Sequence, residues 1–387
     1  MAVRHLNIHD DSSTVSTKQK TEYRWAKVAN KKIYIIAGEP SGDLLGAKIL
    51  RALREDDVTV SGVGGPLLQN EGLVSLFDIR EISHGGIVEL IPHIPRIKQL
   101  IKMTVEDIVK ARPDVLLTID SPGFSFRIAK IIKKRNLGIR TVHFVAPSVW
   151  AWRPKRAQKI AKIYDVLLAL FDFEPQYFLK YGLRTEFVGH PLVEDFEECE
   201  DFPKSDTLLL MPGSRLQEIK QMLPIFLAFA DDFHHAGRVV IPTLPHLRSI
   251  IEGMVESRGI EIITDEKIKN EMYRKAGLAV VASGTATLQL ALARCPMIVC
   301  YKMNGITYNI IKPLVKTEYI ALCNIVLNAK IVPELIQKEC TAENIMRHAS
   351  NLDKEFQISR FKELRDRLYN DGVSPSKRIS EIIIGVR

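Results

Sequence analysis

Short apolar runs alternate with amphipathic stretches from residue 32 onward. In the first half of the chain, the apolar runs end in Gly, Pro or Ser and cover residues 33–38, 58–64, 114–120, 140–147, 165–171 and 186–190. Helical periodicity occupies residues 44–53, 97–110 and 126–135 between them. Apolar strands that alternate with helices are typical of a parallel sheet covered on both faces. The pattern predicts a doubly wound α/β domain.

The same pattern restarts after an irregular acidic stretch, residues 194–206, which contains Pro203. Apolar runs follow at 207–211, 238–242, 261–264, 278–282 and 297–301, and residues 353–386 look helical. We expect a polar extension without fixed structure at 1–31, a first domain at 32–200, a second at 201–352 and terminal helices at 353–387. In such sheets, ligands bind at the carboxyl ends of the strands, here in a cleft between two domains.

Composition excludes several classes of protein. The 387 residues suit two domains, and the 46% hydrophobic and 26% charged residues are those of a globular protein. No apolar run approaches the ~20 residues of a membrane-spanning helix. The net charge of +8 suits an anionic membrane, a phosphorylated substrate or nucleic acid, but no nucleic-acid-binding motif is present. The five cysteines form no CxxC pair and are interpreted as free thiols, and the histidines show no metal-binding spacing.

Two motifs in the first half carry carboxylates. Residues 37–43 read AGEPSGD, which is not a phosphate loop, because the spacing is GxxxG and Asp43 stands where Lys is required. Glu39 and Asp43 suit sugar hydroxyls or proton transfer better than a phosphate; alternatively, the segment is a turn in which Ser41 or Asp43 caps a helix. Asp120 ends an apolar strand, so it is either a general base whose pKa is raised by partial burial or a helix cap.

Two motifs in the second half suit an anion. Gly213, Ser214 and Arg215 follow a strand and begin a helix, where free N–H groups and a guanidinium could hold a diphosphate. Ser283, Gly284 and Thr285 repeat this arrangement, and Gln289 lies one helical turn further on, within reach of ribose hydroxyls. The alternatives are a capped helix with a solvated Arg215 and an ordinary surface or core amide for Gln289.

A basic and apolar region completes the candidate features. Residues 127–140 and 153–162 carry basic side chains and no acid, and the apolar segment 87–101 is interrupted by Pro92 and Pro95. Such a region could lie on a membrane or accept acyl chains. Alternatively, its isoleucines are core residues and its charges are solvated.

Together these motifs resemble the lipid-A-disaccharide synthases, a family of bacterial glycosyltransferases, from about residue 32 to the C-terminus. The resemblance is carried by AGEPSGD (37–43), GIVE (86–89), PSVWAWRPKR (147–156), FVGHPLVE (187–194), LMPGSR (210–215), SGTATLQLALARCPMIVCYK (283–302) and VKTEYIALCNI (315–325). It implies a GT-B fold, with two Rossmann-like domains and terminal helices that return to the first. It also implies an inverting transfer of 2,3-diacylglucosamine from UDP to 2,3-diacylglucosamine 1-phosphate (lipid X). The family needs no cofactor or metal and works on the cytoplasmic face of the inner membrane, with monomer or homodimer left open.

The resemblance also implies roles for individual residues. Asp120 would be the essential carboxylate of the first domain, and Arg215 would contact the diphosphate. Our own hypothesis is that Asp120 is the general base, with Glu39 as the alternative base, and that Arg215 stabilises the leaving diphosphate. The acceptor side would be formed by Ser41, Gly42, Asp43 and His190. The UDP donor would be bound by Gly213, Ser214, Arg215, Ser283, Gly284, Thr285, Gln289 and Asn324.

The chain departs from the family pattern at Gly123, where a second Asp is common, at Gln289, where Glu is usual, and at Cys323, where Pro is common. Two other functions therefore stay open. One is another UDP-sugar enzyme of this fold, such as a UDP-GlcNAc 2-epimerase. The other is a nucleotide-sugar-binding protein without activity.

Overall fold

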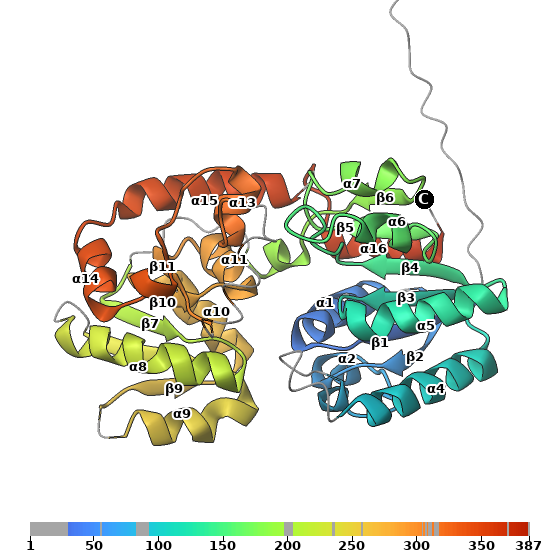
Figure 1. Ribbon diagram of the computed structural model, residues 1–387, viewed down its shortest axis with the longest axis horizontal. Helices are drawn as coiled ribbons and strands as arrows, with labels where there is room; N and C mark the ends of the chain where they lie inside the picture. The colour runs from blue at the N-terminus through green and yellow to red at the C-terminus, as the bar shows by residue number, and fades with distance from the viewer. Residues whose placement is uncertain are drawn as a thin grey trace, which may run out of the picture.

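The chain forms two bodies, each built on a parallel six-stranded sheet with helices on both faces (Figure 1). The computed structural model describes residues 30–54, 56–82, 93–196, 204–233, 237–256, 258–303, 305, 308, 312, 317–369 and 371–385. The predicted extension at 1–31 therefore lies almost entirely outside the described residues.

The first sheet has the strand order β2-β1-β3-β4-β5-β6. Its strands are β1 (Lys31–Ala37), β2 (Val58–Val63), β3 (Val115–Ile119), β4 (Arg140–Phe144), β5 (Val166–Ala169) and β6 (Arg184–Phe187). Alternate residues of β1 enter different cores: Ile33 and Ile35 share one cluster, whereas Tyr34 and Ile36 share another. Both faces of this sheet are therefore covered, as its continuous apolar strands predict.

The helices of the first domain divide between these two faces. The helices are α1 (Pro40–Ala52), α2 (Pro66–Asn70), α4 (Ile94–Ala111), α5 (Pro122–Arg135), α6 (Arg156–Ile160) and α7 (Gln176–Leu179), with the 3-10 turn η1 (Ile79–Glu81). Helix α1 contributes Leu45 and Ile49 to the face of Ile33. Helices α4 and α5 contribute Leu100 and Ile128 to the face of Tyr34.

The second sheet has the order β12-β11-β10-β7-β8-β9. Its strands are β7 (Thr207–Met211), β8 (Arg238–Pro242), β9 (Glu261–Ile263), β10 (Leu278–Ala282), β11 (Met297–Tyr301) and β12 (Glu334–Ile336). One face is covered by α8 (Leu216–Asp232), α9 (Arg248–Met254) and α14 (Ala342–Ser350). The other is covered by α10 (Glu266–Lys275), α11 (Thr285–Leu292), α13 (Leu322–Leu327) and α15 (Lys354–Tyr369). Two further 3-10 turns are η4 (Pro245–Leu247) and η6 (Gln337–Glu339).

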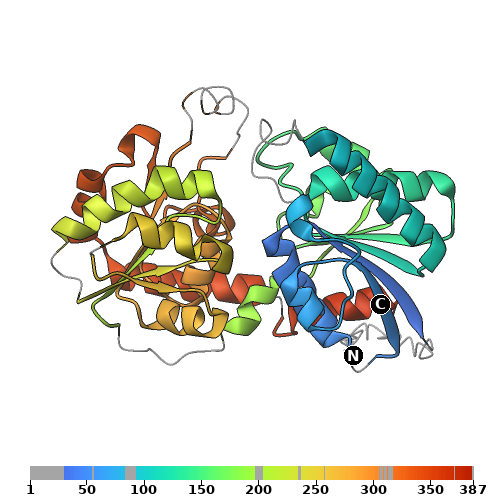
Figure 2. The same cartoon turned by 90° about the horizontal axis from the view of Figure 1, so that it is seen from below.

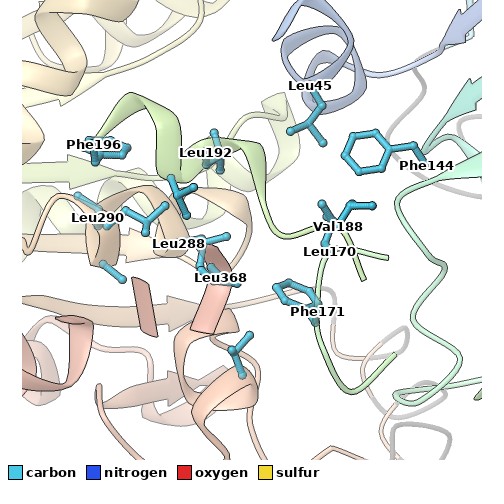
Figure 3. Packing of buried hydrophobic residues seen from close by; sticks show 14 of the residues in the cluster. Leu45, Phe144, Leu170, Phe171, Val188, Leu192, Phe196, Leu288, Leu290 and Leu368 are labelled. Carbon is cyan, nitrogen blue, oxygen red and sulfur yellow. The ribbon is translucent and has the colours of Figure 1, made fainter. Parts of the chain in front are cut away.

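The two domains are joined twice. The turn η3 (Pro191–Asp195) leads from the first domain to the second, and Leu192 and Phe196 lie beside Leu288 and Leu290 of α11 (Figure 3). The chain then returns after α15, since the last helix, α16 (Pro375–Ile384), packs against α1 in the first domain (Figure 2). The Ile384 carbonyl there accepts a 2.7 Å hydrogen bond from the Lys31 ammonium group.

The predicted fold class is confirmed: two doubly wound α/β domains, with a terminal helix that returns to the first. Within the predicted terminal pair, α15 packs on the second domain and touches the first only near its C-terminal end, where Arg367 pairs with Asp172, whereas α16 packs on the first. The strand expected at 186–190 instead forms at Arg184–Phe187, and the short β12 was not expected. Four cysteines are buried free thiols, as expected, and Cys199 lies outside the described residues.

Candidate active site

The sheet topology selects one point at the carboxyl edge of each sheet. In the first sheet, the chain leaves β1 toward β2 on one side, whereas β3 lies on the other. In the second, β8 and β10 lie on opposite sides of β7. Loops diverge at such switch points, and doubly wound sheets bind ligands there. Glu39 and Asp120 follow β1 and β3, and Arg215 and Ser283 follow β7 and β10, so the predicted residues occupy both switch points.

Asp120 lies in a strained turn directly after β3. Asp120 and Ser121 have φ values of +50° and +47°, a left-handed conformation that few residues other than Gly adopt. The Ser41 hydroxyl donates to the Asp120 carboxylate over 3.3 Å. Burial raises the pKa of Asp120, against the opposing effects of hydrogen bonds from Ser121 and Ser41 and of the Arg215 charge. The residue as a whole is partly exposed, so the turn that carries this carboxylate of raised pKa is not sealed in the core.

Glu39 approaches Arg215 across the junction of the two domains. The distance from Glu39 Oε2 to the nearest guanidinium nitrogen is 3.7 Å. Burial and the neighbouring Asp120 charge raise the pKa of Glu39, and Arg215 opposes this rise. Two carboxylates of the first domain therefore face a cation of the second.

Gly38 lets the loop before Glu39 approach the turn after β3. A Cβ atom at residue 38 would lie 2.5 Å from Ser121 Oγ. Only Gly fits at such a distance, and the first Gly of AGEPSGD therefore holds the two catalytic candidates together.

The first predicted anion-binding turn, formed by Gly213, Ser214 and Arg215 and here called the first anion cradle, already holds a carboxylate. The turn after β7 passes through Gly213 with φ +121°, and α8 begins after Arg215. Glu218 Oε2 accepts from the backbone N–H groups of Ser214 at 3.0 Å and Arg215 at 3.3 Å, and Oε1 lies 3.3 Å from the guanidinium. Glu218 was missed in the sequence, although an acid three residues after a helix cap is the signal of a capping box.

In the second predicted anion cradle, formed by Ser283, Gly284 and Thr285, no carboxylate of the described residues occupies the helix terminus. The N-cap residue of α11 is Gly284, which has no side chain that could occupy the helix terminus. No acid lies in the first turn of this helix, and Gly284 and Thr285 are exposed. Gln289 is partly exposed one turn along α11. Because β7 and β10 are neighbouring parallel strands, this helix terminus lies next to the turn that bears Arg215. The open N–H groups and the guanidinium suit one diphosphate between them.

Asn324 does not line the second anion cradle but stabilises a loop that contacts it. Its side chain is fully buried and bonds the backbone of Ile331 and Val332. It also donates to Glu334 over 2.9 Å. Glu334 accepts from the N–H groups of Ile320 and Ala321, and the Ile320 carbonyl accepts from the Ser283 hydroxyl at 2.9 Å. Asn324 therefore fixes the loop that holds Ser283.

Asp43 and Gly42, expected on the acceptor side, are buried. The Asp43 carboxylate accepts from the backbone N–H groups of Gly65, Leu67 and Leu68 at 2.9, 3.0 and 3.0 Å, so it caps α2. The alternative in which Ser41 or Asp43 caps its own helix is wrong, because Glu39 is the N-cap residue of α1. A Cβ at Gly42 would lie 3.2 Å from the Ile119 carbonyl, so this Gly permits close packing on β3.

His190 is also buried, at the junction of the domains. Its Nδ1 accepts from the Leu192 N–H, and its backbone N–H donates to the Leu368 carbonyl of α15. Burial and the nearby Lys48 charge lower the pKa of His190 to about 3. The imidazole is therefore neutral and caps η3, and the backbone of His190 joins this turn to α15.

A buried carboxylate that sequence analysis missed stands beside β5. Glu174 accepts from the N–H groups of Leu170 and Phe171, and its other oxygen accepts from the Trp150 indole at 3.2 Å. Trp150 meets Phe173 edge to face, with ring centroids 5.4 Å apart. Glu174 thus fixes an aromatic group at the same carboxyl edge as Asp120.

The apolar segment at 87–101 is described only in part, since residues 83–92 lie outside the described residues. Ile97, Leu100 and Ile101 are core residues of α4, as in the alternative in which the apolar residues of this segment pack in the core; Ile94 is exposed. In the described ranges, no helix has the length and apolarity to cross a bilayer. The same residues hold no group of three or more His, Cys, Asp or Glu side chains suited to a metal ion.

Solved structures with the same architecture define the class of protein. The Staphylococcus aureus protein MnaA, solved with UDP, superposes with a TM-score of 0.63 at 16% identity, covering 93% of this chain and 97% of that one. The Methanocaldococcus jannaschii UDP-GlcNAc 2-epimerase gives a TM-score of 0.56 at 13% identity, covering 91% of this chain and 99% of that one. At such identities the likeness shows the fold alone: this is an α/β protein of the GT-B class.

Sequence comparison then gives the family. The family model described as lipid-A-disaccharide synthetase matches residues 33–380. The lipid-A-disaccharide synthase of Ruegeria pomeroyi is 38% identical over 91% of this chain and 94% of its own length. The lipid-A-disaccharide synthase of Rickettsia bellii is 40% identical, over 91% of this chain and 98% of its own length. The chain belongs to the lipid-A-disaccharide synthase family, which favours the first interpretation of the sequence over the epimerase.

Proposed function

We propose that this protein transfers 2,3-diacylglucosamine from its UDP derivative to the 6-hydroxyl of 2,3-diacylglucosamine 1-phosphate, and releases UDP. The observation that carries the proposal is the meeting of opposite charges at the two switch points. Asp120 and Glu39 of the first domain face Arg215 of the second, beside the open terminus of α11. Family membership supplies the substrate pair.

The reaction is a single displacement with inversion. The acceptor hydroxyl gives its proton to Asp120, its oxygen attacks the anomeric carbon, and the bond from that carbon to the β-phosphate oxygen breaks. UDP leaves with the electron pair. A raised pKa suits Asp120 to this role, because a base is most effective when its pKa approaches the working pH. Glu39 is the alternative base.

Arg215 and the N-terminus of α11 would stabilise the charge that develops on the leaving diphosphate. Removing one preorganised donor of this kind costs about 10²–10³ in rate. Arg215→Ala should therefore lower turnover by this factor, whereas Arg238→Ala is a matched control, because Arg238 pairs with Glu261 at the amino ends of β8 and β9, the edge of the sheet opposite to Arg215. Equal turnover in the two variants would refute the role of Arg215.

We further propose that the enzyme works at the cytoplasmic face of the inner membrane. The support is the exposed basic residues of α5, namely Arg127, Lys130, Lys133, Lys134 and Arg135, of which Lys133 also pairs with Asp165. Clustered basic residues attract anionic lipid surfaces. Co-sedimentation with vesicles of anionic and of neutral lipid tests this separately from activity: binding to anionic vesicles only is expected, and equal recovery with both would contradict it.

The direct test of the reaction is transfer of a radiolabelled diacylglucosamine from its UDP derivative to lipid X in detergent. We expect a labelled disaccharide phosphate and an equal amount of UDP. UDP-GlcNAc is the matched control donor, since it shares the nucleotide and sugar but lacks the acyl chains. Conversion of UDP-GlcNAc to its 2-epimer, without transfer from the acylated donor, would replace this proposal by the epimerase. UDP binding without turnover of either compound would indicate an inactive binding protein.

A further inference from the structure

Arg215 has two carboxylate neighbours, one from each domain. Glu39 of the first domain lies 3.7 Å from one guanidinium nitrogen, and Glu218 of the second lies 3.3 Å from another. Both terminal nitrogens of Arg215 therefore have a carboxylate neighbour, and a diphosphate that binds both of them competes with at least one carboxylate. The contacts of the two acids decide which one moves.

Glu218 is held more firmly than Glu39. Its carboxylate also accepts from two backbone N–H groups, those of Ser214 and Arg215, and its side chain is 21% exposed. The side chain of Glu39 is 35% exposed, and Glu39 is an N-cap residue whose side chain makes no capping hydrogen bond. Displacing Glu39 costs only a partly exposed ion pair, whereas displacing Glu218 would leave backbone donors of a helix terminus unpaired.

We propose that Glu39 and the donor diphosphate compete for Arg215, so that donor binding releases the Glu39 carboxylate toward Asp120 and the acceptor. This inference rests on the proposed function and adds to it the order of events at Arg215: the donor binds first, and Glu39 is released afterwards. Without donor, Arg215 holds Glu39 across the domain junction. With donor bound, Arg215 pairs with the diphosphate, and Glu39 is free to contact an acceptor hydroxyl.

The causes of the raised pKa of Glu39 also support this competition for Arg215. Arg215 is the neighbour that opposes the rise in the pKa of Glu39, whereas burial and Asp120 raise it. When the diphosphate neutralises Arg215, that opposing effect weakens. Glu39 then binds a proton more readily, at the moment when both substrates are present. An acceptor that arrives before the donor meets a carboxylate already engaged by a cation.

The test is calorimetric titration with UDP, which needs neither acylated substrate. Glu39→Gln removes the competitor, and a solvent-accessible ion pair corresponds to ~0.2–1 kcal/mol, so UDP should bind about 1.4- to fivefold more tightly. Glu271→Gln makes the same change of charge in α10, where Glu271 pairs with Lys275, and should leave UDP affinity unchanged. Unchanged or weaker binding of UDP by Glu39→Gln would overturn the proposal.

A double-mutant cycle separates competition for Arg215 from plain repulsion between Glu39 and UDP. In an Arg215→Ala background, Glu39→Gln should no longer tighten UDP binding. Equal tightening in both backgrounds would overturn the competition. If the unmodified protein does not bind UDP at all, the proposed function fails and this inference fails with it. If transfer proceeds and UDP binds, but Glu39→Gln has no effect on affinity, only the inference fails.

Discussion

Asp43 offers a quantitative test of how the first domain is assembled. Its carboxylate is 3% exposed and accepts three backbone N–H groups at the start of α2. Asp43→Ala leaves those donors unpaired in a buried place. A lost helix cap costs ~0.5–2 kcal/mol, and each buried unpaired donor costs ~1–3 kcal/mol. Since the three donors share one side chain, we expect about 3–5 kcal/mol in all, rather than their sum.

Asp43→Asn should cost less than Asp43→Ala. The Oδ1 atom receives two of the three hydrogen bonds, from Gly65 and Leu68, and an Asn carbonyl can keep them. The bond from Leu67 to Oδ2 is lost, because an amide NH₂ group cannot accept it. One hydrogen bond to a charged group corresponds to ~1.5–3 kcal/mol.

Urea denaturation followed by circular dichroism measures these differences in unfolding free energy. Ser41→Ala is the control on the same helix, because its hydroxyl makes one 3.3 Å contact at a partly exposed site and should cost ~1 kcal/mol or less. If Asp43→Ala is as stable as Ser41→Ala, the capping role is refuted. A large rise in the KM for the acceptor at unchanged stability would instead place Asp43 on the substrate.

Two further predictions concern the second domain and the pH profile. Asn324→Ala should weaken UDP binding as well as stability, because it frees the loop that holds Ser283; calorimetric titration of a variant that binds UDP normally would contradict this. The pKa values of Asp120 and Glu39 are raised, and a base must be deprotonated to act, so kcat/KM should fall on the acid side at a pH above the ordinary carboxyl pKa of about 4. An acid limb at or below that value would contradict the assignment of the base.

Much of the fold could be predicted from hydrophobic runs, because strands covered on both faces are continuously apolar. The runs at 207–211, 238–242, 278–282 and 297–301 coincide with β7, β8, β10 and β11. The prediction failed for strands whose sequence is not continuously apolar. β6 is an edge strand that begins Arg-Thr-Glu, and β12 is three residues long and begins with Glu334.

The part of the site that could be predicted is the set of residues that directly follow the predicted strands. Loops at the carboxyl ends of parallel strands meet at one edge, so Glu39 and Asp120 could be expected together from the sequence. Arg215 follows β7 of the second sheet, and its place opposite them was expected from two domains that face each other across a cleft. The partners of buried polar groups could not. Asp43 caps a helix more than twenty residues away, and Asn324 is paired with Glu334 of a strand that sequence analysis missed. Such contacts depend on how separate elements pack, which local patterns do not report.

The central claim is that Asp120 removes the acceptor proton while the second domain holds UDP. The most direct measurement is the turnover of Asp120→Asn, made beside its affinity for UDP. Asn keeps the shape and the hydrogen bond from Ser41 but is a far weaker base. The account predicts that nearly all transfer is lost while UDP binds as in the unmodified protein. Near-normal transfer, or a collapse of UDP affinity, would contradict it.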